Sequence, residues 1–214
     1  MTARVAALVL AGALATAPLA AQVSRFAGTD AGAYRVRFHS AWQGGGEALS
    51  GFAVGGQTRL VLGHVSLDAS YAQGRLTADT GAAAARDLVD GSLALVVRPT
   101  HWLALKAGPH LRAYVAPGGT ERWVLWEARA RGESAIIPGV LQAHIEGWIA
   151  VASDVNVAPG AAGAHGGEAG LTLRLAQSPF WARLAYAVDR ARMTNDVRTE
   201  TVETVFLGIG YGGR

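Results

Sequence analysis

The side chains in this sequence that could do acid–base chemistry are histidines and carboxylates spaced two residues apart. His144 and Glu146 are separated by one residue, so on an extended strand both would point to the same side. Such a pair could serve as a general base and a general acid. His39 adjoins Ser40, but neighbours on a strand point to opposite faces. Single histidines are more often structural residues with hydrogen bonds, so we predict no catalytic residue.

Neither a metal site nor a cofactor is predicted. The chain contains no cysteine, which excludes disulfides, Cys-ligated metals and the acylated cysteine of a lipoprotein. Asp154 and Asn156 would offer two oxygen ligands in a loop. Calcium in proteins takes about six to eight oxygens, so this is a weak signal.

The charged residues instead belong to segments in which polar and apolar side chains alternate. Residues 101–115 show this most clearly. One face carries Leu103, Leu105, Ala107, Leu111, Ala113 and Val115, and the other carries Lys106, His110 and Arg112. Period-two alternation is typical of a β-strand with one apolar and one polar face.

About ten such segments follow one another along the chain. Tight turns are predicted at 63–64, 98–101 and 177–179, and long loops at 43–50, 77–86, 153–166 and 193–199. The two kinds of connection alternate, which is typical of a barrel that spans an outer membrane. We predict an all-β fold, a closed antiparallel up-and-down transmembrane β-barrel of about ten strands, with eight as the alternative.

Three local features qualify this prediction. Residues 121–131 would also suit one face of a helix, and the connection at 132–138 is long for a turn. Pro109 lies inside a strand, where it removes a ladder hydrogen bond, so a bulge is expected there.

Aromatic residues near strand ends suggest a girdle at the membrane interfaces. These are Trp42, Trp102, Tyr114, Trp123, Phe180, Trp181 and Tyr211.

The N-terminus has the layout of a secretory signal peptide. Arg4 precedes an apolar run that ends near Ala17, and Ala20 and Ala21 follow. This run is short for a membrane-spanning helix, and cleavage is expected before Gln22. We therefore divide the chain into a signal peptide (1–21), a short segment (22–32) and the barrel (33–214).

The last strand resembles the C-terminal assembly signal of bacterial outer-membrane barrels. In that signal, alternate apolar residues lead to a terminal aromatic residue, and here they are Val205, Leu207, Ile209 and Tyr211. The chain departs from the pattern by continuing to Arg214. The resemblance implies a location in the outer membrane, contact with its lipid and recognition by the barrel-insertion machinery. It covers architecture only and identifies no subfamily.

The predicted register gives the barrel a charged interior. In the first strand, Tyr34, Val36, Phe38 and Trp42 are placed toward lipid and Arg35, Arg37 and His39 toward the lumen. The charged lumen network is predicted to comprise Arg35, Arg37, Arg59, Asp68, Asp90, Lys106, Arg112, Glu127, Arg129, Arg131, His144, Glu146, Glu168, Arg174, Arg183 and Asp189. Buried charges require partners, so an ion-pair network is expected. In this register cations outnumber carboxylates, so any pore would favour anions.

These observations predict a non-enzymatic outer-membrane protein, either a structural or surface protein or a narrow porin-like channel. The alternatives are an outer-membrane lipid-modifying hydrolase and a soluble periplasmic barrel that binds a small apolar ligand. Nucleic-acid binding is not indicated, because the net charge of +3 comes from arginines spread singly along the strands. The sequence leaves the oligomeric state open.

Overall fold

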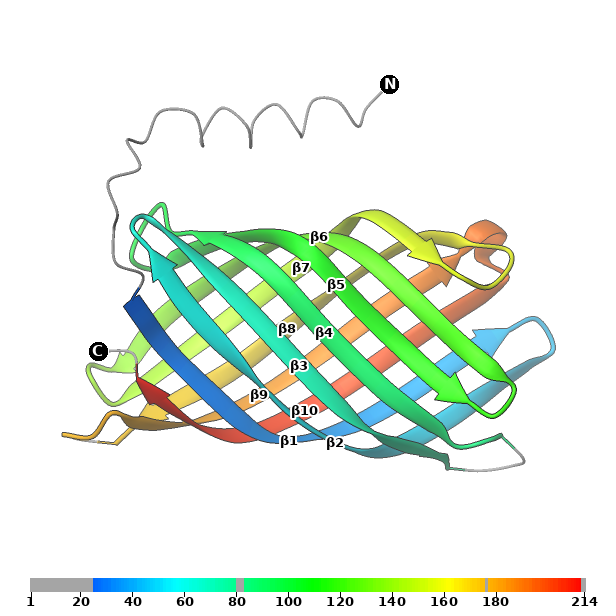
Figure 1. Ribbon diagram of the computed structural model, residues 1–214, viewed down its shortest axis with the longest axis horizontal. Helices are drawn as coiled ribbons and strands as arrows, with labels where there is room; N and C mark the ends of the chain where they lie inside the picture. Colours follow the sequence, from blue (N-terminus) through cyan, green and yellow to red (C-terminus); the bar gives the residue numbers. More distant parts are fainter. Residues whose placement is uncertain (1–24, 80–82, 176, 213–214) are drawn as a thin grey trace, which may run out of the picture.

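The computed structural model describes residues 25–79, 83–175 and 177–212, and these form a barrel of ten antiparallel strands (Figure 1). The strands are β1 (Arg25–Trp42), β2 (Gly45–Leu62), β3 (Val65–Ala78), β4 (Arg86–Val97), β5 (Leu103–Ala116), β6 (Gly119–Ile137), β7 (Leu141–Val155), β8 (Ala161–Arg174), β9 (Phe180–Met193) and β10 (Arg198–Gly212). The predicted fold class and strand number are confirmed. The predicted signal peptide lies outside the described residues.

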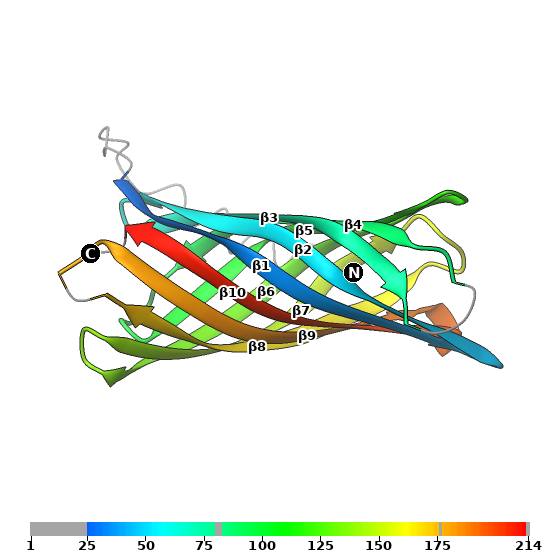
Figure 2. The ribbon, with the colours of Figure 1, turned by 90° about the horizontal axis from the view of Figure 1, so that it is seen from below.

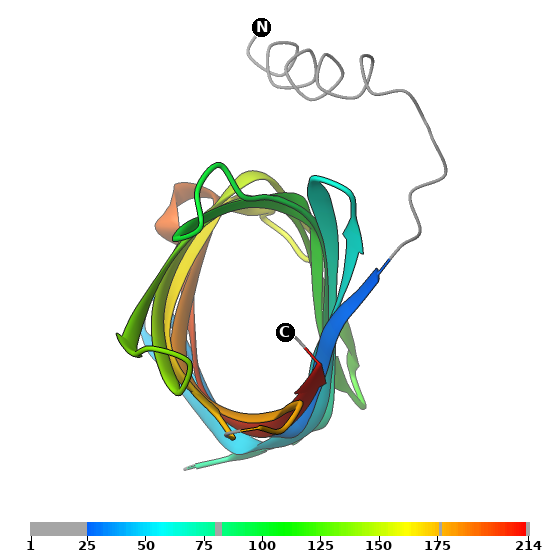
Figure 3. The same ribbon diagram turned by 90° about the vertical axis from the view of Figure 1, so that its left-hand side faces the viewer.

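The barrel closes because the first strand pairs with the last. β1 and β10 pair in register from Gly28 opposite Gly212 to Trp42 opposite Arg198, and every other strand pairs with its neighbours in sequence. β1 and β10 lie side by side in Figures 1 and 2, and Figure 3 looks along the resulting oval ring. A closed sheet leaves no edge strand with unpaired backbone groups.

The two ends of the barrel differ in what they carry. The start of β1 and the end of β10 lie at one end, together with the connections that follow β2, β4, β6 and β8 (left in Figure 1). We call this the terminal end. The other five connections, including the 3-10 turn η1 (Thr194–Asp196), lie at what we call the loop end.

The connections at the loop end are shorter than predicted. β2 begins at Gly45, and the predicted loop 153–166 contains the end of β7 and the first part of β8. At the terminal end, residues 132–137, predicted as a connection, belong to β6. β1 begins eight residues before the predicted start at Ala33. The Gly- and Ala-rich segment at the start of β8 is therefore strand and not a loop, and two of its glycines, Gly166 and Gly170, lie where a side chain would not fit. A Cβ at Gly166 would lie 2.5 Å from both Trp148 Nε1 and Asp189 Oδ1.

Most of the outer surface is apolar. Ile145, Leu207 and Ile209 keep 64–71% of their surface exposed, although they belong to regular strands that are hydrogen-bonded on both sides. Exposed aromatic residues, Trp102, Phe180 and Tyr211, lie at the terminal end. Such a surface matches a hydrocarbon environment with an interfacial girdle. Tyr114 and Trp123 are buried inside the barrel and are not part of a girdle.

The predicted register is wrong for β1. Arg35, Arg37 and His39 are exposed on the outer surface, whereas Val36 and Phe38 are buried inside. The predicted outward residues of β2 to β10 do point outward. β1 differs because the inside of the barrel is apolar near the loop end, so the apolar face of its second half is buried there.

The expected bulge at Pro109 is also absent. The ladder between β4 and β5 is interrupted at Gly108 and Pro109, but the pairs on either side, including Ser92 with His110, keep the same register. A register shift does occur one ladder further on, between β6 and β7 at Trp126 and Glu127, and others lie at the ends of β1, β6 and β8. Because proline has no backbone N–H, Pro109 interrupts the hydrogen-bonded ladder without inserting an extra residue into the strand.

Because the outer surface changes in polarity along the barrel, an introduced arginine should lower the free energy of unfolding by different amounts at different positions of one strand. Leu105 and Val115 face outward on β5 and are 45% and 40% exposed. Leu105→Arg places a charge in the apolar belt and should lower the free energy of unfolding in bilayers by more than about 1 kcal/mol, the upper limit of the cost near an interface. Val115→Arg, near the loop end, should cost about 0–1 kcal/mol. Reversible denaturant unfolding in phosphatidylcholine vesicles measures both, and equal costs would contradict this placement.

Candidate functional site

The interior of the barrel is the main place where charged side chains gather. Inward-facing residues from all ten strands form a network of ion pairs at the level of the apolar outer belt, a layer of apolar side chains nearer the loop end, and a second ion cluster beyond it. Each layer is built by the period-two alternation of the strands.

His110 on β5 lies at the centre of the first part of the network. Its Nδ1 lies 2.7 Å from Glu127 Oε1, and its Nε2 lies 3.0 Å from Asp90 Oδ2. Arg112 donates to Asp90 and to Asp189, both at 2.7 Å. The contact with Asp189 joins β5 to β9 across the barrel, so the network ties opposite walls together.

A second part of the network runs toward the terminal end. Arg129 Nε donates to Glu127 at 2.8 Å, and its Nη1 donates to Glu146 at 3.1 Å. Lys106 Nζ lies 2.7 Å from Glu146 and 3.7 Å from Asp68. These side chains are largely buried, and each has an oppositely charged partner, as buried charges require.

The third part of the network lies nearer the terminal end, on β6 to β9. Arg131 contacts Glu133 at 2.9 Å, and His144 Nε2 lies 2.8 Å from Glu168. Arg183 lies 3.2 Å from the buried Asp30 on β1. Its guanidinium also covers the ring of Phe206 at 4.4 Å.

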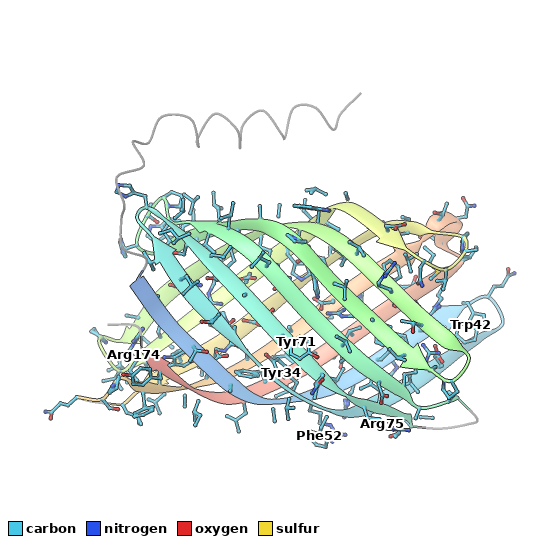
Figure 4. All side chains as sticks on the ribbon, viewed as in Figure 1. Tyr34, Trp42, Phe52, Tyr71, Arg75 and Arg174 are labelled. Atoms are coloured by element: carbon cyan, nitrogen blue, oxygen red, sulfur yellow. The ribbon has the colours of Figure 1, made fainter. Side chains whose placement is uncertain are left out.

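Most of the residues predicted for the lumen network come together in this way. Arg59 contacts Asp68 at 2.5 Å, and Arg174 lines the opening at the terminal end (Figure 4). Arg35 and Arg37 do not belong to the network, because they lie on the outer surface. His144 and Glu146 share a face but contact different partners, so they are not a pair.

Several charged interior residues were missed by the sequence analysis. Asp30 was missed because the first strand was expected to begin at Ala33, and Arg198 because it fell in the predicted loop 193–199. Glu200 follows that loop directly and was not assigned to a face. Glu133 fell in a predicted connection. The signal was present in each case, since continuing the alternation of the strand would have found these residues.

The predicted excess of cations is not present. Among the described inward residues, carboxylates outnumber arginine and lysine. The carboxylates are Asp30, Glu47, Asp68, Asp90, Glu121, Glu127, Glu133, Glu146, Glu168, Asp189 and Glu200. The cations are Arg59, Arg86, Arg98, Lys106, Arg112, Arg129, Arg131, Arg174, Arg183 and Arg198. The argument for an anion-selective lining therefore fails.

An apolar layer lies on the loop-end side of the network. It includes Phe38, Leu49, Leu76, Leu88, Tyr114, Trp123, Leu125, Val155 and Val202, all buried. The rings of Phe38 and Tyr114 pack with centroids 4.8 Å apart. Arg198 lies beyond this layer, 3.0 Å from Glu121 and 2.7 Å from Glu200, and Arg86 lies 2.6 Å from Glu47.

Three cavities of different size lie along the inside of the barrel. A cavity of about 580 Å³ opens at the terminal end between Arg59, Arg98, Arg131, Arg174 and Trp181. A cavity of about 180 Å³ follows in the ion-pair network. A cavity beside Trp123, Leu125 and Trp148 in the apolar layer measures about 20 Å³, enough for about one water molecule.

Interior histidine and serine side chains among the described residues contact other interior side chains. Both ring nitrogens of His110 contact carboxylates, and the hydroxyls of Ser70 and Ser92 contact each other at 2.7 Å. The amide of Asn156 binds backbone atoms of Thr120 and Arg122. Within residues 25–79, 83–175 and 177–212, no group of three or more His, Asp or Glu is placed to hold a metal ion. Over the same residues, no helix is long and apolar enough to cross a membrane.

Solved structures with the same architecture are outer-membrane barrels. The translocator domain of the autotransporter NalP from Neisseria meningitidis superposes with a TM-score of 0.51 at 10% identity, covering 95% of this chain and 92% of that chain. Neisserial surface protein A gives 0.42 at 10% identity, with coverages of 89% and 99%. An outer-membrane channel from Pseudomonas putida F1 gives 0.45 at 10% identity, with coverages of 91% and 99%.

At these identities the likeness shows the fold alone. No protein-family model and no curated protein matches the sequence. The chain thus has the architecture of small bacterial outer-membrane β-barrels, and the subfamily is not identified.

The ion-pair network predicts unequal costs for the loss of two arginines. Arg129→Met would leave Glu127 and Glu146 buried without one of their partners, and it should lower the free energy of unfolding by about 3–5 kcal/mol. Arg75→Met is the control, because Arg75 is 70% exposed and lies 3.7 Å from an exposed Asp87. Its loss should cost less than about 1 kcal/mol. Denaturant unfolding in vesicles measures both, and a small cost for Arg129→Met would refute a stabilising network.

Proposed function

We propose that this protein is a closed, non-enzymatic β-barrel of the bacterial outer membrane, which acts as a structural or surface protein and not as an open channel. The observation that carries the proposal is the apolar layer across the interior. Phe38, Leu49, Leu76 and Tyr114 come from four strands, and each has at most 1% of its surface exposed. A hydrated ion would have to leave its water shell to pass such a layer.

The outer surface supports a position in a membrane. An exposed apolar belt on every strand would be unfavourable in water, and closure removes the unpaired backbone groups that hydrocarbon does not tolerate. With the termini on the periplasmic side, the loop end faces outside the cell. Val205, Leu207, Ile209 and Tyr211 point outward on β10, where the insertion machinery would recognise them.

A narrow channel is the second candidate, and the cavities favour it. The spaces of about 580 Å³ and 180 Å³ both include Asp68, Arg131 and Arg183 in their walls. A polar space thus leads from the terminal end to the middle of the barrel. For this candidate, the apolar layer would have to open.

Recordings in planar bilayers separate the two candidates. Wild-type protein should show no conductance steps, because the apolar layer closes the barrel. Removing two of its aromatic rings in Phe38→Ala/Tyr114→Ala should produce small steps. Phe52→Ala is the control, because Phe52 points outward from the neighbouring strand and is 62% exposed, and it should remain silent. Steady conductance of the wild type would favour the channel.

The orientation can be tested with single cysteines, since the chain has none of its own. Gly118 lies in the loop-end turn between β5 and β6, with open space around it. Gly118→Cys should react with a membrane-impermeant maleimide in intact cells. His64→Cys, in the turn after β2, should react only after the outer membrane is permeabilised. The reverse pattern would invert the proposed topology.

A further inference from the structure

The outward-facing charges are confined to one level of the barrel wall. Within the described strands, every charged side chain that points outward lies in the half of its strand nearer the loop end. These residues are Arg35, Arg37, Arg75, Asp87, Arg122, Asp154, Arg190, Arg192 and Glu203, with His39 and His165 beside them. Nearer the terminal end, the outward residues of the same strands are apolar or uncharged.

The arginines gather on one side of the barrel. Arg190 and Arg192 lie on β9, Arg35 and Arg37 on β1, and Arg75 on β3. These strands are joined through β10 and β2, because the barrel closes between β1 and β10. We call these five residues the arginine arc.

The arc borders the apolar belt directly. Arg35 lies opposite Val205 on β10 and opposite Phe52 on β2, and Phe52 in turn lies opposite Arg75 on β3. Figure 4 shows Phe52 and Arg75 projecting from the same side of the barrel. Arg190 follows the outward Val188 on β9 by two residues. A lipid whose chains cover the belt would therefore bring its headgroup to the arc.

The guanidinium groups of the arc are exposed to a ligand. Arg37 and Arg190 have no hydrogen-bonding or ion-pair partner among the described residues, although Glu203 lies opposite Arg37 on β10. Arg75 lies 3.7 Å from Asp87 and Arg192 lies 3.5 Å from Asp196, and all four of these side chains are more than half exposed. Exposed ion pairs of this kind are weak. The guanidinium of Arg35 covers the ring of Phe52 at 5.3 Å, which leaves its N–H groups free at the edge of the plane. Arginine presents planar donors that match a phosphate group in geometry and charge.

We propose that the arginine arc binds the phosphate groups of a phosphorylated glycolipid in the outer leaflet, with the acyl chains of that lipid on the apolar belt below. The occupant is a lipid because the cationic and apolar surfaces are continuous. A soluble anion would contact only the cationic surface. The proposal rests on the proposed function for the orientation of the barrel, but its test does not depend on the barrel being closed.

The test uses the full-length mature protein in detergent micelles, with diphosphorylated lipid A as the probe and native mass spectrometry as the readout. Wild type should retain lipid A and should bind its dephosphorylated form much more weakly. An arginine at a charged lipid surface contributes about fivefold in affinity. Arg35→Gln/Arg75→Gln should therefore reduce retention about 25-fold. Arg35→Lys/Arg75→Lys, which keeps the charge, should restore much of it.

The control variant also removes two positive charges, but from positions outside the arginine arc. Arg122 lies on β6, on another part of the wall, and Arg174 lies at the terminal end (Figure 4), so Arg122→Gln/Arg174→Gln should retain lipid A as wild type does. An equal loss of lipid A retention in this control would mean that net charge alone explains the effect, and it would overturn the proposal. Equal retention of dephosphorylated lipid, or equal binding of inorganic phosphate by the lipid-free protein, would overturn it as well. Heat-modified mobility on electrophoresis verifies that each variant is folded.

Discussion

The hydrogen bonding between β1 and β10 is the interaction on which the rest of the structure depends. Without it, the first and last strands would leave a row of unpaired N–H and C=O groups in hydrocarbon, which lipid cannot satisfy. Closure also defines an inside and an outside. The alternation along each strand then becomes a division between an apolar wall and a charged interior, and Arg112 can reach Asp189 from the opposite side of the barrel.

The barrel reverses its polarity along its axis. At the level of the apolar belt, the outer residues are apolar and the inner residues are ion pairs such as Lys106 with Glu146. Nearer the loop end, Phe38 is buried inside while Arg37 is exposed outside. This second arrangement is that of a water-soluble protein with an apolar core. In the proposed membrane position, this change in polarity would mark the edge of the bilayer, with the arginine arc at that edge.

The interior charges and the apolar layer have different consequences for function. The ion pairs neutralise one another, so the walls present no excess of cations that would select an anion. The apolar layer leaves little room for water beside Trp123. The accessible surfaces of the barrel are the belt, the arc, the loop end and the cavity at the terminal end. The proposed structural or surface role would use the first three of these surfaces.

The sequence by itself determined the strands and their two faces, because period-two alternation is a local property of an extended chain. Residues 101–115 show both faces of β5 without any knowledge of the fold. Which face of β1 points inward was decided only by the tertiary structure, since Tyr34 to Phe38 and Arg35 to Arg37 alternate equally well in either register. The tertiary structure also decided the partner of Asp30, because Arg183 comes from the distant strand β9. Alternation defines two faces, but only closure and the depth of the bilayer decide which one is buried.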